Sequence, residues 1–107
     1  MTDGTATTIP IASDVIATLL RHEAELRRAG VRRLSLFGSV ARGEADADSD
    51  IDLVAEFDPA ARMDLIRLVG LERELTALLG RDVEILPEPI ESERLRPRVE
   101  RDRVRAF

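Results

Sequence analysis

Residues 31–57 decide the fold, and they read VRRLSLFGSVARGEADADSDIDLVAEF. Two largely apolar runs, residues 31–37 and residues 49–57, enclose a Gly-Ser dipeptide and a polar spacer. Each run has the length and the residue types of a β-strand, and the spacer has the composition of a turn. The segment therefore predicts two strands with a short connection that starts at Gly38.

The second run places two carboxylates on one side of its strand. Side chains alternate between the faces of a strand, so Asp50 and Asp52 share a face. Two carboxylates at this separation repel each other unless water or a cation lies between them, and their hard oxygen ligands suit Mg²⁺, which also binds substrate phosphates. The pair predicts a metal site at an edge of the sheet. The opposite face of this strand carries Ile51, Leu53, Ala55 and Phe57.

The Gly-Ser dipeptide predicts a phosphate-binding turn. Gly38 has no side chain, so the backbone can approach a bulky anion there. Ser39 adds a hydroxyl, and we expect the first amides of a short helix to follow it, where exposed N–H groups favour phosphate. Arg42 lies about one turn further on and could add positive charge. Triphosphate and metal ions would thus be bound side by side.

This arrangement resembles the minimal nucleotidyltransferases of the DNA polymerase beta superfamily, whose hallmark is Gly-Ser, about ten residues, then Asp-x-Asp. The hallmark is present in Gly38-Ser39 and Asp50-Ile51-Asp52. The resemblance runs from about residue 13 to residue 106. It implies an α/β fold with a small mixed sheet of about three strands flanked by helices, in which the third strand, residues 81–86, carries a third carboxylate.

The resemblance also implies a reaction: transfer of a nucleoside monophosphate from a triphosphate, ATP by analogy with the family, to an acceptor hydroxyl. Two Mg²⁺ ions would assist the displacement. Glu84 would ligate one ion and help to deprotonate the acceptor. The implied catalytic and metal-binding residues are Asp50, Asp52 and Glu84, and the implied nucleotide-binding residues are Gly38, Ser39 and Arg42.

Glu84 departs from the family, which usually has Asp at this position. The longer side chain can still reach a metal or a hydroxyl, but geometric errors near 1 Å can cost about a hundredfold in rate. The departure therefore leaves open a protein that neutralises its partner by contact alone, with a degraded active site.

We expect a partner to supply the acceptor, because no additional domain for acceptor recognition is expected in this chain. Stand-alone domains of this size resemble the antitoxins of two-gene modules, whose partner is a helical HEPN ribonuclease toxin. The resemblance thus implies a hetero-oligomeric antitoxin that adenylylates a toxin hydroxyl, most simply that of a tyrosine. The alternatives are contact-only inhibition, and a nucleotidyltransferase that acts on an RNA end or a small molecule.

Composition predicts one domain. The 107 residues are 44% hydrophobic, which suffices for one small core, and we expect a flexible tail over residues 1–12 before a single domain over residues 13–107. No apolar run is long enough to span a membrane, and the N-terminus lacks a signal-peptide pattern, so we expect a cytoplasmic protein. A net charge of −5 argues against direct nucleic-acid binding.

The remaining pattern predicts helices around the strands. Ser13 is expected to cap a helix over residues 14–29 that Gly30 stops. Asp58-Pro59 is expected to open a second long helix that ends before Gly80, and a last short helix should begin near Pro97. The apolar face of the first helix is expected to comprise Val15, Ile16, Leu19, Leu20 and Leu26, and that of the second Leu65, Leu68, Leu71, Leu75, Leu78 and Leu79.

Overall fold

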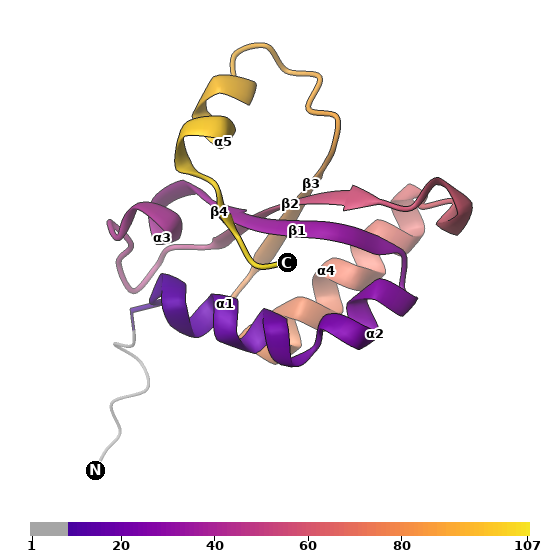
Figure 1. Cartoon of the computed structure of the whole chain (residues 1–107). Coiled ribbons are helices and arrows are strands. Elements are labelled where there is room, and N and C mark those ends of the chain that lie inside the picture. The colour runs from indigo at the N-terminus through magenta and orange to yellow at the C-terminus, as the bar shows by residue number, and fades with distance from the viewer. Residues whose placement is uncertain (1–8) are drawn as a thin grey trace.

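The computed structural model describes residues 9–107 (Figure 1). Residues 1–8 of the predicted tail over residues 1–12 lie outside the described residues, and α1 begins at Ala12. The helices are α1 (Ala12–Arg21), α2 (Glu23–Arg28), α3 (Gly38–Arg42), the 3-10 helix η2 (Pro59–Ala61), α4 (Leu65–Leu79) and α5 (Arg96–Asp102). The strands are β1 (Val31–Phe37), β2 (Ile51–Phe57), β3 (Val83–Pro87) and β4 (Val104–Arg105).

The strands form one mixed sheet in the order β3-β2-β1-β4. Strand β2 is antiparallel to β1 and parallel to β3, and β4 is antiparallel to β1. The predicted small mixed sheet is confirmed, with β4 as a strand beyond the three predicted ones. Two residues are too few to show a period in the sequence, and β4 is held by its pairing with β1, beside which the Leu34 N–H donates to the Phe107 carbonyl at 3.0 Å.

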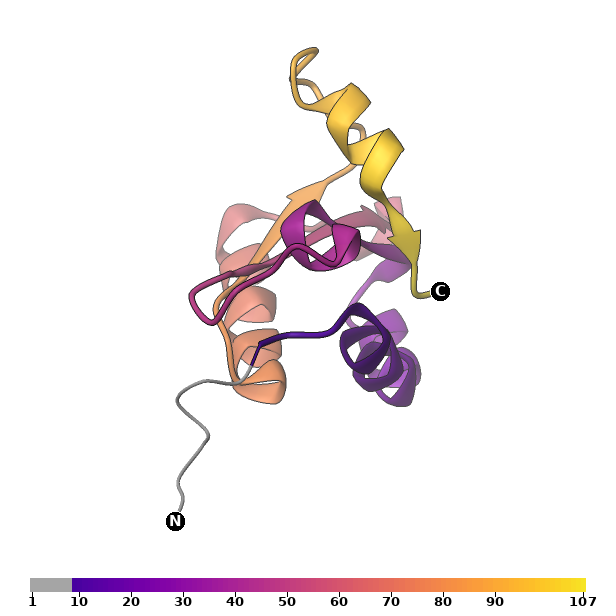
Figure 2. The same cartoon turned by 90° about the vertical axis from the view of Figure 1, so that its left-hand side faces the viewer.

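Helices cover the two faces of the sheet unequally. Helices α1, α2 and α4 lie on one face, and α5 stands on the other (Figures 1 and 2). The main core lies under the first group of helices, where Leu36 and Leu53 are fully buried against residues such as Leu19 and Leu75. A smaller cluster of Val54, Ile90 and Val99 lies on the other face, beneath α5.

The single helix predicted over residues 14–29 is wrong, because the chain forms α1 and α2 with a break at His22. His22 Nδ1 lies 2.9 Å from the Thr18 carbonyl oxygen, the acceptor that the His22 backbone N–H would use in a continuous helix. The backbone N–H donates to Leu19 instead. The predicted stop at Gly30 is confirmed, since α2 ends just before that residue, which has φ +109°.

The predicted cap of the first helix is also wrong. Ile11, and not Ser13, is the N-cap residue, and its carbonyl accepts from the N–H groups of Asp14 and Val15. The helix thus begins at Ala12, before the residue that was expected to cap it. Of the predicted apolar residues, Val15 and Leu19 of α1 and Leu26 of α2 are buried. Ile16 is partly buried against the core, but Leu20 is 45% exposed.

The second long helix begins later than predicted. Asp58 does act as a cap, but only of η2, which ends at Arg62 in the left-handed conformation. Helix α4 then starts with its own cap, since the Asp64 carboxylate accepts from the Arg67 N–H at 2.8 Å. Of the six predicted core leucines, Leu71 and Leu75 are buried, Leu68 and Leu79 pack at the margin of the core, and Leu65 and Leu78 are exposed.

The C-terminal part of the fold agrees with the prediction. Gly80 ends α4 with φ +71°, β3 follows it, and α5 has Pro97 in its first turn. Among residues 9–107, no helix has the length and apolar character needed to cross a bilayer.

Candidate active site

Gly38 and Asp52 meet where β1 passes into α3. Phe37, the last residue of β1, pairs with Asp52 of β2 in the antiparallel ladder. Gly38 follows with φ +80°, and a Cβ atom built on it would lie 2.5 Å from Oδ2 of Asp52. The missing side chain of Gly38 therefore lets the backbone of the turn lie directly against the carboxylate.

The short helix expected after the Gly-Ser turn is α3, which begins at Gly38 itself. Ser39 lies in its first turn and is partly exposed. The helix ends at Gly43, whose φ of +74° lets the chain reverse, and the Glu44 N–H then donates to the Ser39 carbonyl at 2.9 Å. Figure 1 shows α3 at the end of the sheet where β1 stops and β2 starts.

Asp52 and Glu84 occupy neighbouring strands at the same level. They are partners in the parallel ladder between β2 and β3, so their side chains point to the same face of the sheet. Asp50 lies just before β2 and is exposed. The pKa of Asp52 is raised by burial first, and then by the negative charges of Glu84 and Asp50, against which the positive charge of Arg42 acts. All three predicted carboxylates therefore act on one site electrostatically.

The chemical type of the ligand atoms at this site suits a divalent cation. Carboxylate oxygens are the ligands that Mg²⁺ takes in proteins, and a bound cation would relieve the repulsion from Glu84 and Asp50 that, after burial, raises the pKa of Asp52. Within residues 9–107, however, no three His, Cys, Asp or Glu side chains are gathered closely enough to form a ready metal cluster. The structure thus brings Asp52 and Glu84 together as neighbours and leaves Asp50 at the margin.

Arg42 is held by two carboxylates. Its Nε donates to Glu44 at 2.9 Å and its Nη1 donates to Asp102 at 2.7 Å, and both bonds raise the pKa of the Arg42 guanidinium. The Asp102 side chain is only 4% exposed and also accepts from Arg101. Arg42 is therefore tied to α5. The sequence gives no sign of the contact with Asp102, which lies 60 residues away.

Two side chains of α4 hold the exposed edge of β3 on either side of Glu84. The Val83 N–H donates to Thr76 Oγ1 at 3.1 Å, and the Ile85 N–H donates to Glu72 Oε2 at 2.7 Å. A pocket of about 250 Å³ at this edge is lined by Asp50, Glu72, Asp82, Val83 and Glu84. Sequence reasoning missed Thr76 and Glu72, because it used helix α4 only for its apolar face.

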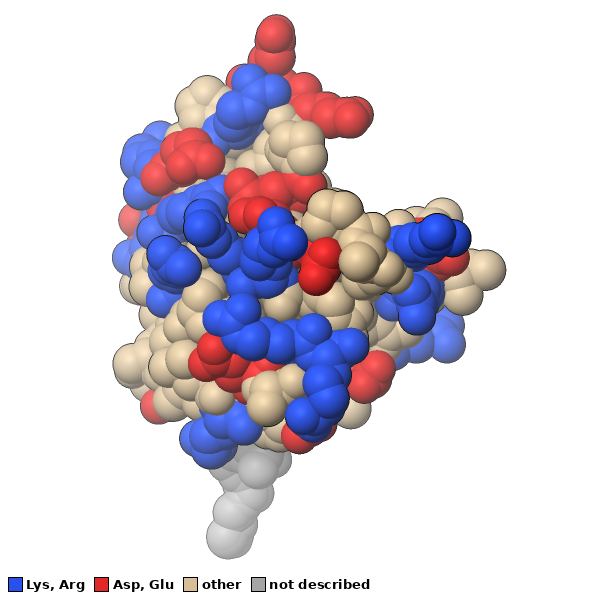
Figure 3. All heavy atoms as spheres, turned by 45° about the vertical axis from the view of Figure 1, so that its right-hand side comes forward, with Lys and Arg blue, Asp and Glu red and all other residues tan. Residues whose placement is uncertain are grey.

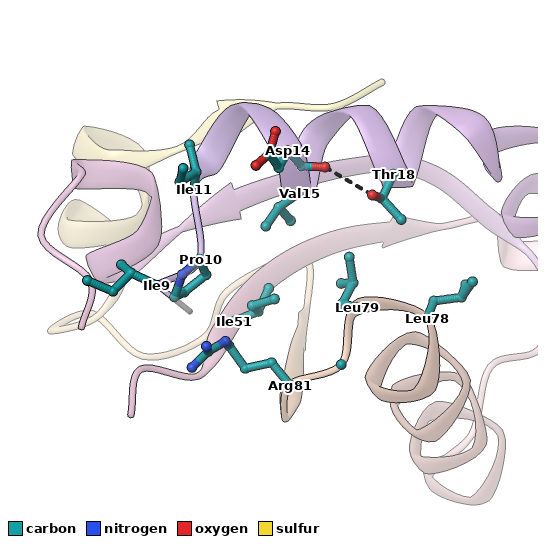
Figure 4. A pocket seen from close by; sticks show the side chains of 11 residues that line it. Ile9, Pro10, Ile11, Asp14, Val15, Thr18, Ile51, Leu78, Leu79 and Arg81 are labelled. Carbon is teal, nitrogen blue, oxygen red and sulfur yellow. Dashed lines mark hydrogen bonds between the residues drawn. The ribbon is translucent and has the colours of Figure 1, made fainter. Parts of the chain in front are cut away.

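A different pocket, of about 360 Å³, lies between α1 and the end of α4 (Figure 4). Its lining is largely apolar and includes Val15, Ile51 and Leu79, with Asp14 and Arg81 as charged members. Ile51 belongs to the core face of β2, so the pocket lies on the opposite side of the sheet from Asp52. It is not the site of the predicted carboxylates.

Known proteins are similar to this chain in sequence and in fold. The protein adenylyltransferase MntA of Thermococcus cleftensis is 40% identical over 74 residues, which span 68% of this chain and 73% of that protein. A provisionally assigned minimal nucleotidyltransferase has a solved structure that superposes with a TM-score of 0.72 and 35% identity over 88% of this chain and 94% of its own. The predicted fold class is thereby confirmed.

A further solved structure shares the fold alone, at 21% identity and a TM-score of 0.64. It is a complex of a tri-AMPylated HEPN toxin with its MNT antitoxin from Shewanella oneidensis, and the match covers 87% of this chain and 71% of that one. Residues 19–106 match the family model described as a nucleotidyltransferase domain, and this range includes the Gly-Ser turn, the Asp-x-Asp strand and Glu84. By this match and by its identity to MntA, the chain belongs to the nucleotidyltransferase domain family.

Proposed function

We propose that this nucleotidyltransferase is an antitoxin that transfers AMP from ATP to a hydroxyl, that of a tyrosine, on a HEPN ribonuclease toxin, and thereby inactivates it. The observation that carries the proposal is the placement of Asp52 between the Gly38 turn and Glu84. A phosphate-binding turn beside a pair of neighbouring carboxylates is what phosphoryl transfer requires. The names of the relatives support the class of acceptor, since MntA is a protein adenylyltransferase.

Each predicted site residue has a role in this reaction. Gly38 and Ser39 would bind the β and γ phosphates through backbone amides and the Ser39 hydroxyl, with Arg42 as a further contact. Asp50, Asp52 and Glu84 would hold two Mg²⁺ ions. When bound, these ions stabilise charge on the attacking and leaving oxygens.

The reaction forms one bond, breaks one bond and releases one proton. The acceptor oxygen forms a bond to the α phosphorus, the bond from that phosphorus to the bridging oxygen breaks, and pyrophosphate leaves. Glu84 would accept the proton of the acceptor hydroxyl, because a carboxylate held beside the reacting group can act as a general base.

The charge distribution supports a protein acceptor over a nucleic acid. Arginines gather on the face shown in Figure 3, but acidic side chains lie among them. Arg32 pairs with Glu56 at 3.5 Å, and Arg103 pairs with Glu88 at 2.9 Å. Charges neutralised in this way are not available to displace counterions from a phosphate backbone. We propose a hetero-oligomer with the toxin, without direct nucleic-acid binding, in the cytoplasm.

Two observations favour a second function, inhibition by contact alone. Arg42 is bound by Glu44 and Asp102, and the three carboxylates are not gathered into a metal cluster within residues 9–107. A domain with a degraded site could still bind its toxin. The two functions differ in whether protection requires the carboxylates.

A protection assay separates them. Cells that express a HEPN toxin of the same module are given this chain or its Asp50→Asn, Asp52→Asn variant. Loss of protection in the double variant supports catalysis, whereas retained protection supports contact. Asp48→Asn, which removes an exposed carboxylate from the spacer, is the matched control and is expected to protect fully.

A further inference from the structure

The position of Asp50 is set differently from that of Asp52. Asp52 is fixed inside the sheet by its pairing with Phe37 on one side and Glu84 on the other. Asp50 precedes the first residue of β2, so no ladder pair fixes it. Its place depends on the part of the spacer that joins α3 to β2, residues 43–50.

The spacer contains a compact turn of its own. The Asp46 carboxylate accepts from the Asp48 N–H at 2.9 Å, and the Ser49 N–H donates to the Asp46 carbonyl at 3.2 Å. These bonds shape the turn but do not tie it to the domain. At its start, the Glu44 N–H binds the Ser39 carbonyl, which anchors the spacer to α3.

Arg81 anchors the other end. Its Nη1 donates to the Ala47 carbonyl at 2.7 Å and to the Ser49 carbonyl at 2.9 Å. The guanidinium therefore binds the backbone on both sides of Asp48 and directly before Asp50. The Ile51 N–H also donates to the Asp82 carbonyl at 2.9 Å. Figure 4 shows the Arg81 side chain extending beside Ile51, along the pocket on the far side of the sheet from Asp52.

We propose that Arg81 is a positioning residue that fixes Asp50 relative to Asp52 through its hydrogen bonds to the Ala47 and Ser49 carbonyls of the spacer. The proposal rests on the proposed function, because Asp50 matters only if the carboxylates bind metal and nucleotide. Charged hydrogen bonds from a guanidinium are stronger than those between neutral groups, so Arg81 can order a polar loop that lies outside the sheet.

Three variants test the proposal. Arg81→Met keeps the apolar stem beside Ile51 and removes the donors. Arg81→Lys keeps a positively charged donor at this position. Arg73→Met removes an exposed arginine of α4 and is the matched control. The readouts are hydrogen exchange of the Asp48 and Ser49 amides, Mn²⁺ affinity of the protein alone, and the kcat and KM for ATP in AMP transfer.

Arg81→Met is expected to speed exchange at Asp48 and Ser49 by at least about tenfold while the β2 amides keep their rates. Mn²⁺ affinity should fall toward that of Asp50→Asn. We expect kcat to drop by about a hundredfold, as for a displacement near 1 Å, with KM for ATP changed less than about threefold. Arg81→Lys should recover most of each loss, and Arg73→Met should match the wild type.

The proposal is overturned if Arg81→Met keeps wild-type exchange and Mn²⁺ affinity, or if Arg81→Lys loses as much as Arg81→Met. Should Arg81→Met fail to fold, Arg81→Lys decides. Fast exchange in the spacer together with unchanged Mn²⁺ affinity and kcat would overturn the proposal. Slow exchange together with unchanged Mn²⁺ affinity and kcat supports it. If the wild type transfers no AMP, the proposed function fails, while exchange and Mn²⁺ affinity still test the role of Arg81.

Discussion

The backbone of Gly38 lies so close to the carboxylate of Asp52 that a Cβ atom at residue 38 would be 2.5 Å from Oδ2. This contact joins the two halves of the motif, the Gly-Ser turn and the Asp-x-Asp strand. Any side chain at residue 38 would displace either the turn or the carboxylate. The glycine is therefore required by the site itself as well as by its φ of +80°.

Gly38→Ala is expected to lower kcat for AMP transfer by at least about a hundredfold and to destabilise the fold by about 1–3 kcal/mol, through its left-handed backbone and the clash with Asp52. Gly43→Ala is the matched control, because Gly43 also has positive φ but a Cβ atom there would meet nothing within 4 Å outside the adjacent residues. It should cost about 1 kcal/mol and leave kcat nearly intact. Denaturant unfolding and transfer kinetics measure both, and equal kinetic losses would contradict the account.

The raised pKa of Asp52 predicts how stability changes with pH. The folded-state pKa lies above the unfolded value of 3.8, so the native state binds this proton more tightly than the unfolded state. The contribution to stability is present below the unfolded pKa and is lost as the pH rises through the folded pKa. Asp52→Asn should therefore be more stable than the wild type at neutral pH, and the difference should shrink in acid. Thermal unfolding at several pH values tests this, and a variant less stable at pH 7 would refute it.

Mg²⁺ should stabilise the wild type at neutral pH, because it binds the folded state and relieves the repulsion among the carboxylates. The increase in Tm should rise with Mg²⁺ concentration and disappear in Asp50→Asn, Asp52→Asn. Chelation should reverse it. Asp48→Asn serves as the charge control and should respond like the wild type. A double variant that gains as much Tm as the wild type would place the ion elsewhere.

Glu72→Ala leaves the Ile85 N–H beside Glu84 without its acceptor at 2.7 Å. A hydrogen bond to a charged acceptor is worth about 1.5–3 kcal/mol, and the loosened strand edge should also lower kcat. Glu72→Gln keeps an acceptor oxygen and should recover most of the loss, while Glu74→Ala, which removes an exposed carboxylate of the same helix, should have little effect. Equal behaviour of Glu72→Ala and Glu74→Ala in unfolding would contradict the role of Glu72.

The register of α4 is tested by two leucines. Leu75 is 1% exposed and Leu65 is 74% exposed, although the apolar period of the sequence assigns both to the core. Leu75→Ala is expected to cost about 2–5 kcal/mol, as for a cavity in a packed core. Leu65→Ala should stay within about 0.5 kcal/mol, as for a surface substitution. Similar losses of stability would show that α4 begins earlier or is rotated.

The sequence predicted those parts of the site that are local in the chain. Gly38, Ser39 and Asp50-Ile51-Asp52 lie within 15 residues, and a strand period with a glycine turn suffices to place them. The family resemblance places Glu84 on the third strand, and the structure adds that it pairs with Asp52 in the parallel ladder.

Long-range contacts were beyond prediction. The bond from Arg42 to Asp102 and those from Arg81 to the spacer join polar residues that have no period, so nothing in the sequence marks them as partners. The start of α4 was misplaced for a related reason. Asp58-Pro59 and Asp64 are both good caps, and only the left-handed turn at Arg62 decides which one starts the long helix.

The most direct measurement is the intact mass of the HEPN-type partner after incubation with this chain, ATP and Mg²⁺, beside the same reaction with Asp50→Asn, Asp52→Asn. We expect a partner that gains one or more adenylates in the first reaction and none in the second, with peptide mapping assigning the added mass to a tyrosine. A partner that binds the chain but keeps its mass in both reactions would contradict AMP transfer and leave inhibition by contact.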